Sequence, residues 1–102
     1  MSSSEKQVEQ LLLNANQALN FLRNVLDDLI FKRNDFKPNS QKRILLSQEI
    51  YKKNKAVIHN IENLIKKKEY PLPHKLVQHL IRNLHKRISV IIEEAIELDK
   101  LR

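Results

Sequence analysis

The chain of 102 residues contains no glycine, no cysteine and no tryptophan, and it has only three prolines. Glycine supplies the positive φ angles of tight hairpins and phosphate-binding loops, so its absence excludes the Walker and dinucleotide fingerprints. Without cysteine the chain can form neither disulfide bonds nor thiolate metal sites, which suits a reducing cytoplasm. Because the prolines stand in only two places, we expect long helices joined by two short turns.

Long apolar runs are also missing. The longest are Leu11–Leu13, Leu29–Phe31 and Ile88–Ile92, far short of the ~20 residues that a membrane-spanning helix needs. The polar start, Met1–Lys6, lacks the apolar core of a signal peptide. We therefore expect a soluble, unexported protein with one domain, residues 1–102, built on a single modest core.

Apolar residues repeat every seven positions in three segments, about 4–34, 40–68 and 73–101. The first segment has three such rows, which make a stripe wide enough to pack against two neighbours. These rows are Val8, Ala15, Leu22 and Leu29; Leu11, Ala18 and Val25; and Leu12, Leu19 and Leu26. Three segments of similar length with short connections predict an all-α, antiparallel up-and-down bundle.

Local signals refine this prediction. Ser4, or alternatively Ser2, opens a capping-box pattern before the first helix, and Asn39 or Ser40 can cap the second. Asparagine is a weak helix former, so the Asn-rich stretch 14–20 could break the first helix and give four helices in all.

Two polar features interrupt the apolar rows or follow them. Asn54 shares a row of the second segment with Ile61. A single Asn in an apolar row can fix the register of helix packing, but the preferred interpretation is a solvated residue at the edge of the stripe. The acidic cluster at 93–99 is interpreted as a solvated face rather than a general acid/base pair.

The net charge of +7 is concentrated in the middle of the chain. Residues 39–73 carry eight basic and three acidic side chains, whereas residues 1–38 carry five of each. Antiparallel packing brings the end of the second helix to the start of the third, so basic residues of both should share one neighbourhood. The candidate partner-binding residues are Lys66, Lys67, Lys68, His74, Lys75, His79, Arg82 and Lys86. Such a group suits nucleic acid, an anionic membrane face or an acidic protein.

Catalytic and metal-binding patterns are not apparent. The histidines of the last segment are five and six residues apart, not the three or four that place two ligands on one helix face. Ser89 lies one helical turn from His85, but no orienting acid or glycine-built oxyanion loop accompanies them. We expect no enzyme, no cofactor and no small-molecule substrate.

Nucleic-acid binding is supported by charge alone. The chain has only five aromatic residues as stacking platforms for single strands. Its long segments also leave no short recognition helix after a tight turn. Binding to a duplex backbone without sequence readout remains the third alternative.

Part of the chain resembles the immunity proteins of class II (pediocin-like) bacteriocins, the enterocin A immunity type. The resemblance covers about residues 18–90 and rests on the stretch Leu80-Ile81-Arg82-Asn83-Leu84, on the Lys-rich turn with Leu72-Pro73, and on the turn Phe36-Lys37-Pro38. Members of that family are typically four-helix bundles. Here the first two helices would have to come from residues 4–35, which is a departure unless the first segment breaks.

The resemblance implies a non-enzymatic role in a Gram-positive bacteriocin producer. Such proteins protect the producer from its own toxin. They act from the cytoplasmic side, peripheral to the membrane, on the toxin-bound receptor, a mannose phosphotransferase transporter. Specificity lies largely in the C-terminal half, here the last helix and its basic start. The alternative from another class is a structural subunit of a larger helical assembly, which the apolar residues outside the stripe (Leu13, Phe21 and Phe31) would suit.

Overall fold

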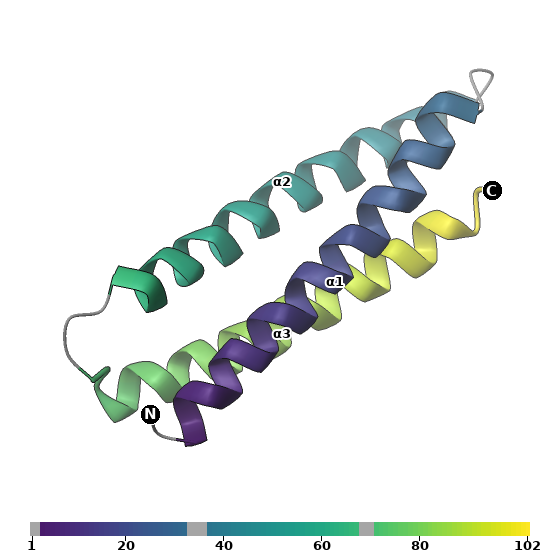
Figure 1. Cartoon of the computed structure of the whole chain (residues 1–102). Helices are drawn as coiled ribbons and strands as arrows, with labels where there is room; N and C mark the ends of the chain where they lie inside the picture. The colour runs from purple at the N-terminus through teal and green to yellow at the C-terminus, as the bar shows by residue number, and fades with distance from the viewer. Residues whose placement is uncertain (1–2, 33–36, 68–70) are drawn as a thin grey trace.

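The computed structural model describes residues 3–32, 37–67 and 71–102, and within them it consists of three long helices (Figure 1). These are α1 (Ser3–Lys32), α2 (Pro38–Lys67) and α3 (His74–Asp99). The chain runs along the bundle, back and forward again, so α2 is antiparallel to both of the other helices (Figure 1). The bundle measures 52 × 20 × 17 Å. The predicted all-α, up-and-down architecture is confirmed.

The alternative of a break in the first helix is wrong and the three-segment prediction is correct, because α1 continues without interruption through residues 14–20. The amide of Asn16 donates to the carbonyl of Leu12 one turn earlier, at 2.9 Å, and to the Glu62 carboxylate of α2, at 2.8 Å. A weak helix former that is hydrogen bonded in this way does not need to leave the helix. Three helices result, with bounds within two residues of those expected where the ends are described; residues 33, 34 and 68 lie outside the described residues.

The predicted caps at Ser4 and at Asn39 or Ser40 are wrong. α1 begins at Ser3, so Ser4 is already inside the helix, and Ser2 lies outside the described residues. α2 begins at Pro38, with the Gln41 amide donating to the Lys37 carbonyl at 3.0 Å, so Asn39 and Ser40 are helical as well. Proline is well suited to the first position of a helix, because its φ is already helical and its missing N–H would have no partner there. Before α3, Pro73 takes the capping position without a side-chain hydrogen bond.

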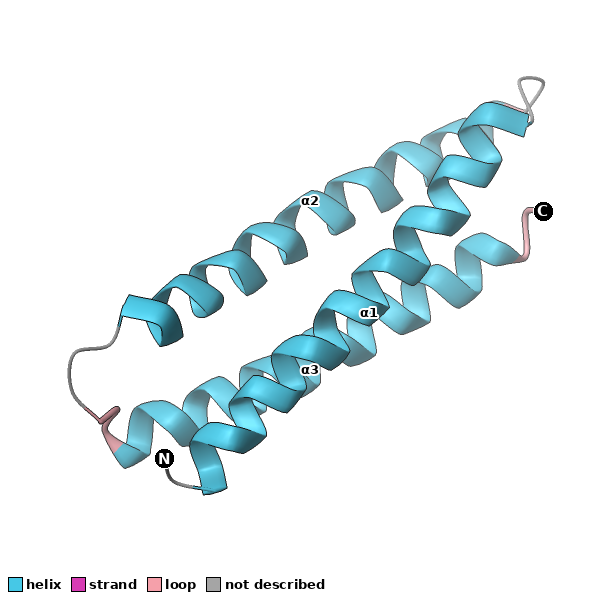
Figure 2. Ribbon diagram, viewed as in Figure 1, coloured by secondary structure: helices cyan, strands magenta, loops and turns pink. Residues whose placement is uncertain are grey.

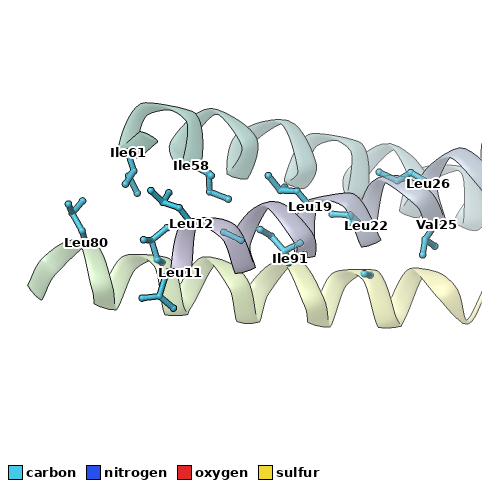
Figure 3. Close-up of a cluster of buried hydrophobic side chains, with 14 of the residues drawn as sticks. Leu11, Leu12, Leu19, Leu22, Val25, Leu26, Ile58, Ile61, Leu80 and Ile91 are labelled. Carbon is cyan, nitrogen blue, oxygen red and sulfur yellow. The ribbon is translucent and has the colours of Figure 1, made fainter. Parts of the chain in front are cut away.

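One core runs between all three helices, and α1 provides half of its buried residues, the largest share of any helix (Figure 3). Each of the ten residues in the three rows predicted for α1 is buried. In Figure 3, α1 lies between the other two helices, with Leu12 and Leu19 directed toward α2 and Leu11 toward α3. The wide stripe therefore packs against two neighbours, as predicted. α1 packs more extensively against α3 than against α2.

α2 contributes few buried apolar side chains and has two buried polar ones. Only Ile44, Ile58 and Ile61 of this helix are buried apolar residues, beside Ser47 and Asn54. The interpretation of Asn54 as solvated is wrong, since the residue is only 3% exposed. It stands seven residues after Ser47 and seven before Ile61, in the row that faces the core.

Glu94 of α3 is buried and forms polar contacts with α2. Its carboxylate accepts from the Ser47 hydroxyl at 2.6 Å and from the Arg43 guanidinium at 2.9 Å. The interpretation of the 93–99 acids as one solvated face is therefore wrong for Glu94, which is buried between α2 and α3. The hydroxyl and the guanidinium that donate to this carboxylate compensate in part for its removal from water.

Candidate binding surface

The outer face of α3 carries a row of four basic side chains, which we call the basic stripe: Lys75, His79, Arg82 and Lys86. Their spacings of four, three and four residues place them on one side of a helix. All four are exposed, and on the helical repeat they point away from Leu84 and Leu80, which face the core. No acidic residue occurs between positions 74 and 87. The stripe is thus a basic surface of α3, about 16 Å long at 1.5 Å per residue, that contains no acidic residue of that helix.

A shallow hollow of about 480 Å³ adjoins the stripe. It is lined by His79, Arg82, Asn83, Lys86 and Arg87. The Arg87 Nε donates to the Asn83 side-chain oxygen at 3.1 Å, so this guanidinium is held against its own helix. The hollow is therefore bordered by Arg82 and Lys86 of the stripe and by Arg87, and its exposed surface is open to an anionic group.

The other predicted partner-binding residues are Lys66, Lys67, Lys68 and His74. Lys66 and Lys67 are exposed at the end of α2, and His74 is exposed as the first residue of α3. These two helix ends lie at the same end of the bundle (Figure 1). The predicted shared neighbourhood therefore holds for the helix ends, whereas Arg82 and Lys86 lie two to three turns farther along α3. Lys68 lies outside the described residues.

The charges of α3 are separated along its length. Residues 74–87 contain four Lys and Arg, and residues 93–99 contain four acids and no Lys or Arg. Both halves oppose the helix macrodipole, which favours acids at the start and bases at the end. The positive end of the dipole and the basic stripe therefore add to the same potential, which attracts anions to this end of the bundle.

The acidic end of α3 is partly neutralised by local pairs. A hydrogen bond from Lys100, at 2.9 Å, and the charge of that ammonium lower the pKa of Glu97 below its ordinary value. Hydrogen bonds to Asp28 and Asp99 raise the pKa of Arg102 above its ordinary value. The Arg102–Asp28 pair joins the end of α3 to α1.

The described residues offer no metal centre. Among them, no group of three histidine, aspartate or glutamate side chains lies close enough together to hold a metal ion. Ser89 and His85 are both exposed on α3. Glu94, the most buried acid of the 93–99 cluster, has both of its oxygens occupied by Ser47 and Arg43.

Sequence reasoning missed a second surface, a groove between α1 and α3. It is lined by Asn14, Gln17, Ala18, Phe21, Ile88 and Ile92. Its signal in the sequence is the uncharged stretch from Gln10 to Leu22, thirteen residues in a chain that is 30% charged.

Comparison of the chain with protein families, with curated proteins and with solved structures finds no match to any of them. No described helix has a segment both long enough and apolar enough to cross a bilayer.

Proposed function

We propose that this chain is a non-enzymatic immunity protein that protects a bacteriocin producer from its own class II bacteriocin. It acts in the cytoplasm, at the inner face of the membrane, on the complex of toxin and receptor. The mannose phosphotransferase transporter is the receptor that the resemblance implies. The observation that carries the proposal is the basic stripe, an exposed basic row on the helix that contains Leu80-Ile81-Arg82-Asn83-Leu84, one of the stretches behind the resemblance.

The residues behind the resemblance divide between core and surface. Leu80, Ile81 and Leu84 are buried and are accounted for by packing. Arg82 is exposed and Asn83 half-buried, so these two can contact a partner. The proposed recognition therefore depends on Arg82 and its neighbours in the basic stripe rather than on the apolar part of the motif.

The charge distribution supports approach to the membrane with the basic end first. A Lys or Arg close to an anionic leaflet contributes about 1 kcal/mol to binding. Lys66, Lys67 and Lys75 lie at the leading end in this orientation, and Arg82 and Lys86 follow along α3. Contact with the lipid recruits the protein to the membrane, and the outer face of α3 remains free to contact the toxin–receptor complex.

A killing assay tests the proposal. The chain is expressed in a bacteriocin-sensitive lactic-acid bacterium, which is then challenged with a panel of class II bacteriocins. We expect protection against one or a few of them. Sensitivity to every member of a panel that spans the known receptor specificities would contradict the proposal.

Two matched double variants test the role of the stripe. Lys75→Glu with Arg82→Glu reverses two charges within it, and Lys42→Glu with Lys53→Glu reverses two exposed charges on α2. Both variants lower the net charge equally. We expect the α3 variant to lose protection by about tenfold or more, because like charges now face the anionic partner, and the α2 variant to keep it. Equal protection by the two variants would exclude the stripe as the contact.

A further inference from the structure

The groove between α1 and α3 differs in chemistry from the other surfaces of the bundle. It has a volume of about 490 Å³ and a floor at Ala18, which is buried. Phe21 and Ile92 form part of its walls and are 39% and 38% exposed. One turn farther along α3, Ile96 is also exposed. α1 and α3 lie side by side along this face (Figure 2).

None of the side chains that line this groove is charged. By contrast, the groove between α1 and α2 is lined by Arg23, Asp27, Lys52 and Lys55 among others, and the hollow on α3 by Arg82, Lys86 and Arg87. Depletion of charge around exposed aromatic and aliphatic side chains distinguishes the central part of a protein–protein interface from ordinary surface. We call the groove and its exposed neighbour Ile96 the neutral face.

We propose that the neutral face binds a second copy of this chain, so that the protein forms a two-fold symmetric dimer. The charge distribution argues for this occupant. Each chain carries a net charge of +7, so contact through the α2 surface or the basic stripe would bring rows of cations together. The neutral face lets two copies meet without that repulsion.

The side chains of the neutral face are also complementary to themselves. In a two-fold interface the same patch serves both subunits, so each group must tolerate its own kind as a neighbour. Asn14 and Gln17 satisfy this condition because each amide both donates and accepts hydrogen bonds. Phe21 and Ile92 satisfy it because their burial against apolar atoms of the other copy removes exposed apolar surface from water.

The dimensions set the size of the contact. One long side of a bundle 52 Å long and 17 Å wide has an area of the order of 900 Å², and a standard interface uses about 800 Å² of each partner. The groove itself spans only Asn14 to Phe21 of α1, about two turns, in the middle of that side. The dimer contact is therefore smaller than a standard interface and falls in the class of small, reversible ones, and the basic stripes of both copies remain free.

Sedimentation equilibrium of the purified chain tests the proposal, over about 5 to 500 µM. We expect a concentration-dependent monomer–dimer equilibrium. Ile92→Glu places a charge on the neutral face of both copies and should raise the dimer Kd by about tenfold or more. Leu45→Glu is the matched control, because Leu45 is an apolar residue of α2 that is 61% exposed, and it should leave the Kd unchanged. Circular dichroism of both variants verifies that they remain folded.

Salt dependence provides a second measurement. Because no charges attract across the neutral face, added salt only screens the repulsion between two +7 chains, and the dimer Kd should fall as salt rises. A contact held by ion pairs would show the opposite trend.

A chain that stays monomeric up to 500 µM, or a dimer unaffected by Ile92→Glu, overturns the proposal. If the purified chain is monomeric, the neutral face would bind a different protein, as the alternative of a structural subunit in a larger assembly expects. Protection in the killing assay is scored separately, so either proposal can fail without the other.

Discussion

At the scale of single residues, the polar side chains in the core differ in how fully their buried polar atoms are hydrogen bonded. Glu94 is surrounded by a hydroxyl and a guanidinium that both donate to it. Asn54 is compensated only in part. Its amide nitrogen donates to the Ile50 carbonyl at 2.7 Å, whereas its side-chain oxygen has no hydrogen-bond partner among the described residues and is buried. A buried acceptor without a donor destabilises the fold by about 1–3 kcal/mol.

We predict that Asn54→Leu stabilises the chain. Leucine has the same number and branching of side-chain heavy atoms as asparagine, removes the uncompensated oxygen and adds apolar contact, so we expect a gain of about 1 kcal/mol in the free energy of unfolding. Urea denaturation followed by circular dichroism measures it. Asn60→Leu, at an exposed position of the same helix, is the control for helix propensity and should change stability by less than about 0.5 kcal/mol. A destabilised Asn54→Leu chain would show that the oxygen is needed.

At the scale of the helices, the three elements are anchored unequally. α1 contributes ten buried apolar residues to the core and α3 seven, whereas α2 contributes three. Polar contacts compensate for part of this difference, through Ser47 and Arg43 to Glu94 and through Glu62 to Asn16. Such contacts contribute less net stability than apolar burial, because the same groups are hydrogen bonded to water in the unfolded chain.

We predict that α2 opens more readily than α1 and α3. Parts of a protein with few buried apolar contacts exchange their amide hydrogens through local opening, at lower free energy than global unfolding. Hydrogen exchange followed by mass spectrometry should therefore show faster exchange at the centre of α2, around Val57, than at the centres of α1 and α3. Uniform protection of all three helices would show instead that the bundle opens only as a unit.

At the scale of the whole molecule, one elongated core links the helices, and charge is arranged around it in separate regions. The basic stripe, the neutral face and the paired acidic end of α3 occupy different parts of the surface. This separation allows the proposed partner contact and the proposed dimer contact to be occupied together. Both depend on the same rigid packing of α1 against α3, because α3 presents the stripe on one side and part of the neutral face on another.

We predict that Leu22→Ala strongly destabilises the entire bundle. Leu22 is fully buried near the middle of α1, between α2 and α3, and truncation of such a leucine costs about 2–5 kcal/mol. The urea midpoint should fall accordingly. Leu13→Ala makes the same chemical change on the outer face of α1, where the side chain is 56% exposed, and should have little effect. Equal effects of the two substitutions would contradict the assignment of the core.

The stripe predicted for α1 and the prediction of three helices were correct, because heptad spacing is a local property of the sequence of one helix. Within the core, the errors occurred where a polar residue shares an apolar row. Glu94 comes three residues after Ile91 and four before Leu98, and Asn54 shares its row with Ile61. The spacing alone places both toward the core. It does not say whether a partner from another helix will compensate the polar group.

The fold and the candidate surface likewise combine features that the sequence determines with features that only the packing decides. The sequence by itself determined the helical class, the two turns at the prolines and the basic row along α3, because each follows from residues near one another in the chain. Only the tertiary structure decided that α1 packs mainly on α3, that Glu94 meets Arg43 and Ser47, and that uncharged residues of two helices join in one groove. These features depend on how helices rotate and approach one another, which packing across the whole core determines.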